Sequence, residues 1–279
     1  MSPFQTLLAV LALLICVSAT PLSQLSARAP PETGGPSRRG VSYNDAKYVA
    51  MFNQYGSHVT WAYNWDSRTP PLNTAYEFVP MLHSNRGDHT GKWAADVRAA
   101  ALANPDAPTH LLGFNEPDTC QPGMGGSCMD VNTAVATWKE YMEPQHALKE
   151  KMYLGSPAVT NGAGGLAYLS SFLAACTGCT VDFIAIHWYD HALNAAYFKS
   201  HINLARTLAA GRPLWITEFQ AAGSDDQVKA FLDEVLPWLD VSADVHRYAY
   251  FMASTGDGRL VDNGGASLSN IGQYYAFHA

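Results

Sequence analysis

The stretch HLLGFNEPD, residues 110–118, places a short apolar run directly before a cluster of polar side chains. The same order returns in FIAIHWYD at residues 183–190 and in LWITEFQ at residues 214–220. Apolar runs of this length are typical of strands that are buried on both faces of a parallel sheet. The polar residues that follow each run therefore mark the carboxyl end of a predicted strand.

Runs of this kind recur along the chain and are separated by about 20 to 40 residues, the repeat of a strand followed by a helix. The expected strands are 41–43, 59–63, 78–82, 110–114, 152–156, 183–187, 214–217 and 248–252. Most intervals also carry apolar residues at helical spacing. The expected helices are 45–55, 93–102, 131–148, 168–175, 195–208, 227–239 and 267–277. The interval after the second strand is broken by Thr69-Pro70-Pro71 and predicts no helix.

This alternation predicts an α/β fold, a single-domain (β/α)8 TIM barrel. A doubly wound open sheet is the competing arrangement, and it would ordinarily carry a glycine-rich phosphate loop after its first strand. Tyr43-Asn44-Asp45 at that place offers no such loop. The barrel therefore accounts better for the pattern.

The first part of the chain differs in composition from the rest. Residues 1–19 contain an apolar run followed by small residues, which predicts a secretory signal peptide. Residues 20–39 are poor in large apolar side chains, and we expect a flexible pro-segment or lead-in. The pair Arg38-Arg39 offers a dibasic processing site, and an uncut tail with two solvated arginines is the alternative. The barrel would then occupy residues 40–279, close to the ~250 residues of a typical example.

The charge of the chain limits its partners. The formal net charge is −7, and lysines and arginines are not clustered. Nucleic acid and anionic membranes are therefore not expected as partners, because both require clustered positive charge. We expect a secreted monomer, located outside the cell or in a cell wall.

Four cysteines follow the predicted signal peptide, as two close pairs. They are Cys120 with Cys128 and Cys176 with Cys179. An even number in a secreted chain indicates two disulfides, and local pairing is the simplest of three connectivities. Cys176 and Cys179 also have zinc-ligand spacing, but the first pair lacks it.

Two glutamates stand where barrel enzymes carry their reactive groups, at the carboxyl ends of strands. Glu116 follows the fourth predicted strand and Glu218 the seventh. For either alone, a structural carboxylate that caps a helix or pairs with an arginine is the simpler interpretation. Together they match glycoside hydrolysis, in which one carboxylic acid protonates the leaving oxygen and a second carboxylate attacks the anomeric carbon.

Several segments resemble the catalytic core of glycoside hydrolase family 128. They are residues 112–118, 186–189 and 215–219, with 40–44, 61–65 and 155–158 adding specificity for this family. The resemblance covers the chain from Arg39 to its end. It implies a β-1,3-glucanase of a large retaining clan, with Glu116 as acid/base, Glu218 as nucleophile and Asn115 as the donor to the sugar 2-hydroxyl.

The sixth predicted strand ends in His187-Trp188-Tyr189. Either His187 or Tyr189 can keep Glu218 ionised by a hydrogen bond, and Trp188 can cover a sugar face. A tryptophan at this place can equally belong to the core.

The second predicted strand carries Trp61, Tyr63 and Trp65. We expect Tyr63 to face away from the two tryptophans, and Trp65 to be a platform under a glucose ring. Trp61 is more typical of a core residue. Asn64 and Asn44 are the expected polar contacts to the sugar.

No cofactor is expected, and no metal, because His83, His187 and His191 lack paired ligand spacing and glycoside hydrolysis needs no metal. The sequence thus predicts a secreted retaining hydrolase that cleaves β-1,3-glucan, endo-acting, in cell-wall degradation or remodelling. The alternative is a glucan-binding wall protein of the same fold that has lost turnover. Both carboxylates being present counts against the alternative.

Overall fold

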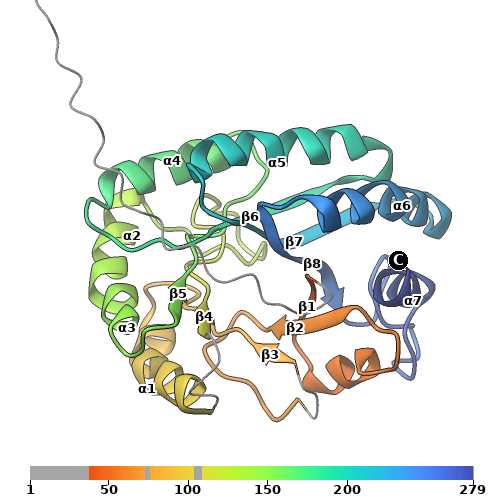
Figure 1. The fold of residues 1–279 in the computed structure, drawn as a ribbon, viewed down its shortest axis with the longest axis horizontal. Coiled ribbons are helices and arrows are strands. Elements are labelled where there is room, and N and C mark those ends of the chain that lie inside the picture. Colours follow the sequence, from red (N-terminus) through yellow and green to blue (C-terminus); the bar gives the residue numbers. More distant parts are fainter. Residues whose placement is uncertain (1–37, 73–75, 104–108, 279) are drawn as a thin grey trace, which may run out of the picture.

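The computed structural model describes residues 38–72, 76–103 and 109–278. Strands lie at the centre and helices surround them, as Figure 1 shows. The predicted signal peptide and nearly all of the predicted lead-in lie outside the described residues. Among the described residues, no helix combines the length and the apolar character that a membrane crossing requires.

Eight parallel strands form the centre, in the order that the sequence predicts. They are β1 (Arg39–Tyr43), β2 (Val59–Tyr63), β3 (Glu77–Phe78), β4 (Thr109–Leu111), β5 (Met152–Leu154), β6 (Ile184–His191), β7 (Leu214–Ala222) and β8 (Val245–Ala253). Six of them form one sheet in the order β3-β2-β1-β8-β7-β6, and β4 pairs with β5. Isolated bridges between Met81 and Leu112 and between Gly155 and Phe183 join the two sheets. Every strand therefore has two neighbours, and the (β/α)8 barrel is confirmed.

The helices follow the strands as expected. They are η1 (Ala46–Phe52), α1 (Gly87–Ala103), α2 (Val131–Thr137), η2 (Trp138–Met142), α3 (Glu143–His146), α4 (Gly165–Ala175), η3 (Ala192–Asn194), α5 (Ala195–Ala209), α6 (Asp225–Val241) and α7 (Asn270–Phe277). The predicted helix 131–148 is divided, because its middle part, η2, is a wider π-helix. Pro144 lies just beyond η2 and has no N–H to donate to the carbonyl four residues earlier, which favours a wider turn there.

Aromatic side chains fill the interior of the barrel. Its central cluster comprises Trp61, Tyr63, Val79, Met81, Leu112, Tyr153, Phe183, Trp215 and Ala249. Two glycines make the space that these rings need. A Cβ on Gly40 would lie 2.2 Å from the Trp61 ring, and a Cβ on Gly155 would lie 2.4 Å from the Phe183 ring. The interior is therefore a packed core, as in other barrels of this type.

The barrel begins earlier than the sequence predicted. Arg39, placed in the flexible lead-in by the sequence, is the first residue of β1 and only 1% exposed. Its guanidinium pairs with Asp240 at 3.1 Å and donates to the carbonyls of Tyr275 and His278 at 2.9 and 2.6 Å. Arg38 donates to the carbonyls of Ser242 and Val245. These bonds contradict the alternative of an uncut tail with two solvated arginines, because both side chains bond to carbonyl groups of the folded barrel.

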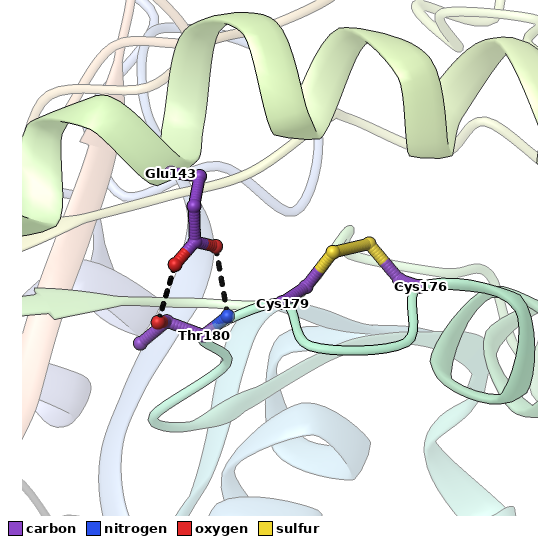
Figure 2. Close-up of a disulfide and its surroundings, with 4 residues drawn as sticks. All are labelled: Glu143, Cys176, Cys179 and Thr180. Atoms are coloured by element: carbon purple, nitrogen blue, oxygen red, sulfur yellow. Dashed lines mark hydrogen bonds between the residues drawn. A yellow bond between two sulfur atoms is a disulfide. The ribbon is translucent and has the colours of Figure 1, made fainter.

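Both local disulfides are present. Cys120 is bonded to Cys128, and Cys176 to Cys179. Figure 2 shows the second bridge beside Glu143, whose carboxylate accepts hydrogen bonds from Thr180 N at 2.8 Å and Thr180 Oγ1 at 2.6 Å. The bridge thus closes the turn after α4, and Glu143 attaches the residue that follows this turn to α3.

Candidate active site

Glu116 and Glu218 are both buried at the carboxyl ends of their strands, 8% and 4% exposed. Glu116 follows β4, where its N–H donates to the Ala158 carbonyl at 2.8 Å. Its φ of 42° lies in the left-handed region, which is uncommon for a residue with a side chain and often found at functional sites. Glu218 lies in β7 directly after a register shift opposite His187. The extra residue at this bulge, Thr217, lets two consecutive side chains reach the same histidine.

His187 of β6 joins the two carboxylates. Its Nδ1 lies 2.8 Å from Glu116 Oε1 and 3.5 Å from Glu218 Oε2, and its Nε2 lies 3.0 Å from Thr217 Oγ1. Complete burial lowers the pKa of His187, but Glu218 and Glu116 outweigh burial and raise it above its usual 6.5. A proton is therefore held readily between His187 and Glu116, in a site with two acidic groups.

Glu218 receives three hydrogen bonds from uncharged donors. Trp65 Nε1 donates to its Oε1 at 2.8 Å, and the Tyr189 hydroxyl donates to its Oε2. The Tyr63 hydroxyl shares its proton between Glu218 Oε1 at 3.2 Å and the Thr217 carbonyl at 3.0 Å. Burial and the neighbouring Glu218 raise the pKa of both tyrosines well above 10, so both keep their protons. These hydrogen bonds fix the position of the Glu218 carboxylate.

The arrangement suits proton transfer better than cation binding. Glu116, His187 and Glu218 offer three possible ligand atoms within 4.8 Å of one another. Each of these atoms is already engaged, since both His187 nitrogens and both Glu218 oxygens have hydrogen-bond partners. A metal ion would have to displace those partners.

Asn115 lies beside Glu116 with one polar atom available. Its Nδ2 donates to the Gly125 carbonyl at 3.1 Å, within the loop that the Cys120–Cys128 bridge closes. Among the described residues, nothing lies within hydrogen-bonding distance of its buried Oδ1. Which end of the amide is oxygen is assigned from such contacts, so the side chain can offer a sugar hydroxyl either a donor or an acceptor. Its predicted contact with the 2-hydroxyl stays a prediction.

The structure corrects two expectations about aromatic residues. Trp188 is fully buried on the outer side of the strand, where its ring stacks on Phe231 of α6 at 5.3 Å and meets Phe198 of α5 edge-on. It belongs to the core and does not reach a sugar.

Tyr63 does not face away from Trp61 and Trp65, as expected, but lies on the same side. Its ring stacks on Trp61 at 5.9 Å and contacts Trp65 at 5.3 Å. Strand side chains alternate, so residues two and four positions apart share a face, and the expectation misapplied that period. All three rings point into the barrel.

The other residues predicted to contact sugar are Asn44, Asn64 and Trp65. Asn44 is exposed directly after β1. Asn64 folds its own loop, because its Nδ2 donates to the Arg68 carbonyl and its Oδ1 accepts from Asp66 N. Trp65 is partly exposed, and its role as a platform stays a prediction beside its bond to Glu218.

Sequence reasoning missed two further residues at the site. Thr217 was assigned to the strand alone, and its hydroxyl contacts His187. Phe251 of β8 packs edge-on against Trp65 at 5.6 Å and Tyr189 at 5.4 Å, the two residues that donate to Glu218 from opposite sides. Phe251 lies within the apolar run of the predicted strand 248–252, so an aromatic residue there gave no signal.

Crystal structures of proteins described as β-1,3-glucanases are similar to this chain in sequence and in fold. A crystal structure of a curdlan-specific exo-β-1,3-glucanase from Blastomyces gilchristii, family 128 subgroup III, is 38% identical, with TM-score 0.73 and coverage of 86% of this chain and 98% of that one. An endo-β-1,3-glucanase from Amycolatopsis mediterranei, solved with laminarihexaose, is 27% identical with TM-score 0.66, covering 86% and 98%.

A curated relative, alkali-sensitive linkage protein 1 of Schizosaccharomyces pombe, is 31% identical over 245 residues, which are 84% of this chain and 42% of that protein. The chain thus spans less than half of that relative's length. The family model described as "Glycosyl hydrolase catalytic core" matches residues 40–275. The chain therefore belongs to the glycosyl hydrolase catalytic core family, and its relatives of known structure place it with glycoside hydrolase family 128.

Proposed function

We propose that this protein is a secreted, retaining glycoside hydrolase that cleaves β-1,3-glucan, with Glu116 as acid/base and Glu218 as nucleophile. The observation that carries the proposal is the pair of buried carboxylates joined by His187, in which one oxygen of Glu116 lies no more than 4.8 Å from one oxygen of Glu218. Retaining enzymes hold their carboxyl groups about 5 to 5.5 Å apart, and inverting enzymes about 6.5 to 9.5 Å apart. The short separation supports retention.

In the first step, Glu218 attacks the anomeric carbon and the bond from that carbon to the leaving oxygen breaks. Glu116 gives its proton to the leaving oxygen, so the released chain ends in a hydroxyl. The donors Tyr63, Trp65 and Tyr189 keep Glu218 ionised and oriented before attack. Their hydrogen bonds weaken as the negative charge of Glu218 passes into the new glycosyl ester bond.

In the second step, Glu116 accepts a proton from water, and the resulting hydroxide oxygen displaces Glu218. Two displacements at one carbon restore its original configuration. His187 supports both steps, because its contact with Glu116 at 2.8 Å lets the two groups share the proton that Glu116 must give and regain. Asn115 supplies an amide at the position beside Glu116 where a 2-hydroxyl would lie.

The β-1,3 linkage is supported by relatives whose descriptions name that bond. Endo action, expected from the sequence, stays a prediction. The relative at 38% identity is described as exo-acting and the one at 27% as endo-acting. The sizes of the first products from a long glucan distinguish the two modes. Secretion rests on the composition of residues 1–19, and a glucan-containing wall or medium is the matching location.

A glucan-binding wall protein without turnover is the second candidate, favoured by the description of the curated relative as a linkage protein. A binding surface would not require two carboxylates held by His187 and three donors. Burying such charge costs free energy that recognition alone would not need.

The test is hydrolysis of a linear β-1,3-glucan, followed from the first minutes by proton NMR and by product size. The proposal expects the β-anomer to appear first and to mutarotate later to the α-anomer. First appearance of the α-anomer would contradict retention. Binding of the glucan without any release of reducing ends would support the second candidate.

A further inference from the structure

We propose that Asn161 is a positioning residue that holds Tyr189 on the nucleophile Glu218, an inference that rests on the proposed function. Asn161 lies in the loop after β5, outside every segment that the sequence pointed to. Its amide makes two reciprocal bonds to the backbone of Tyr189. Nδ2 donates to the Tyr189 carbonyl at 3.0 Å, and Oδ1 accepts from Tyr189 N at 3.0 Å.

These two bonds take the place of main-chain hydrogen bonds that a longer β5 would make with β6. Near the start of this segment the main chains still pair, since His187 N donates to the Val159 carbonyl at 2.9 Å. Beyond Val159 the chain turns away toward α4, whereas β6 continues to His191 along β7. The Tyr189 peptide groups on that side would lose their partners, and buried peptide groups without partners are costly. The Asn161 amide has the same donor and acceptor as a peptide and takes its place.

The residue before Asn161 is fixed to the acid/base side of the site. Asp118, two residues after Glu116, accepts from Thr160 N at 3.2 Å and from Thr160 Oγ1 at 2.5 Å. The Tyr197 hydroxyl of α5 donates to the Asn161 carbonyl at 3.0 Å. A continuous set of bonds therefore runs from Asp118 through Thr160 and Asn161 to Tyr189, whose hydroxyl donates to Glu218. It connects the supports of the two carboxylates.

The consequence concerns the orientation of Tyr189. Its ring is also held edge-on by Phe251, but only Asn161 fixes its backbone on the β5 side among the described contacts. Without the amide, the tyrosine can tilt, and its hydroxyl spends less time on Glu218. The result would be a slower chemical step with little change in glucan binding.

The test is a double-mutant cycle with Asn161→Ala and Tyr189→Phe, measuring kcat, KM and thermal unfolding on a linear β-1,3-glucan. Tyr189→Phe should lower kcat about 10- to 100-fold, and Asn161→Ala about 3- to 10-fold, with KM nearly unchanged. If Asn161 acts through Tyr189, adding Asn161→Ala to Tyr189→Phe should cost less than about 2-fold more.

Asn194→Ala is the matched control. Asn194 is the last residue of η3, directly after β6; its side chain is exposed and bonds only to the Asp190 carboxylate at 3.0 Å in the described structure. Its kcat should equal that of the wild type. An equal fold-loss from Asn161→Ala in both backgrounds, or a loss of stability with unchanged kcat, would overturn the inference while leaving the proposed function intact. Absence of hydrolysis by the wild type would overturn the proposed function and this inference with it.

Discussion

Two glutamate–histidine pairs occupy opposite ends of the barrel interior, and their surroundings differ. At the carboxyl ends of the strands, His187 Nδ1 lies 2.8 Å from Glu116. Toward the amino ends, His110 Nδ1 lies 2.7 Å from Glu77. The two contacts are nearly equal in length, so the pair itself does not determine its role.

The cluster at the amino ends of the strands, formed by Glu77, His110 and Arg247, has balanced charges. Arg247 donates to Glu77 and lies over the Trp215 ring at 4.5 Å. Burial raises the pKa of Glu77, but Arg247 and His110 outweigh it and lower that pKa from 4.5 to about 2. Burial lowers the pKa of His110, so the histidine stays neutral. One negative and one positive charge remain, which is the composition of a structural ion pair.

The cluster at the carboxyl ends of the strands, formed by Glu116, His187 and Glu218, has no such balance of charge. Within the described structure, no lysine or arginine forms an ion pair with Glu116 or Glu218. Two acidic groups share one histidine, and the other donors on Glu218 are uncharged. A missing countercharge means that a proton must be held by the cluster and can be exchanged. In this protein, compensation by an arginine therefore distinguishes the Glu77–His110 pair from the pair at the proposed active site.

The largest effect should come from Glu116→Ala. Loss of the general acid should lower kcat on β-1,3-glucan about 10²- to 10⁴-fold, because the leaving oxygen then departs unprotonated. An aryl glucoside whose leaving group needs no proton should lose much less in the first step. Glu234→Ala is a suitable control, since this glutamate is exposed and pairs only with Lys199 in the described structure. A similar loss with both substrates would argue against the acid role.

Arg247→Met should lower stability and leave kcat unchanged, in contrast to Glu116→Ala. It leaves the partly exposed Glu77 beside His110 without a countercharge, and we expect such a loss to cost about 3 kcal/mol of unfolding free energy, the lower end of the range for buried pairs. At a temperature where the variant is folded, kcat should match the wild type. Chemical denaturation and kinetics at that temperature measure both. Adding Glu77→Gln should recover part of the stability, and a variant that is stable but inactive would break the comparison.

The pH dependence of stability should separate the two ends. Glu77 has a lowered pKa, so its contribution is complete above about pH 4.5 and is lost as the pH falls toward 2. The loss is about 3 kcal/mol. His187 has a raised pKa, so its contribution is complete below pH 6.5 and is lost as the pH rises through its folded value. Urea unfolding across this range should show the acid slope flattened by Glu77→Gln alone; an unchanged slope would contradict the assignment.

The smallest effect is expected far from both clusters. Replacing Cys176 and Cys179 by serine removes a bridge over a sequence separation of 3, which stabilises by about 2 kcal/mol in the chain-entropy description. Figure 2 shows that Glu143 bonds to Thr180 without involving the bridge, so we expect this contact to remain and kcat not to change. Replacing Cys120 and Cys128 should lower activity as well, because Asn115 bonds to Gly125 inside that loop. Thermal unfolding and initial rates compare the two pairs.

Much of the fold could be predicted from the sequence, since burial on both faces makes each strand apolar and each following residue polar. The same reasoning located Glu116, Glu218, His187 and Tyr189. It could not predict that Trp188 faces the helices while His187 and Tyr189 face the glutamates. Alternation places adjacent residues on opposite faces, and the sequence does not say which face is inside.

Other parts of the site left no pattern. Asn161 lies in a loop, where its role depends on β5 ending before β6 does. Arg39 and Arg247 are charged residues in strands, and only the partners that fold against them explain their burial. His110 was counted within an apolar run, although it pairs with Glu77 from a different strand. Contacts between distant segments decide these roles.

The most direct measurement is reducing-end release from a linear β-1,3-glucan by the wild type, Glu218→Gln and the control Glu234→Gln. The account predicts release by the wild type and the control, and a fall of at least about 10³-fold in Glu218→Gln, with binding of laminari-oligosaccharides retained. Glutamine keeps the shape of the side chain but cannot attack the anomeric carbon. Comparable release by Glu218→Gln, or none by the wild type, would contradict the account.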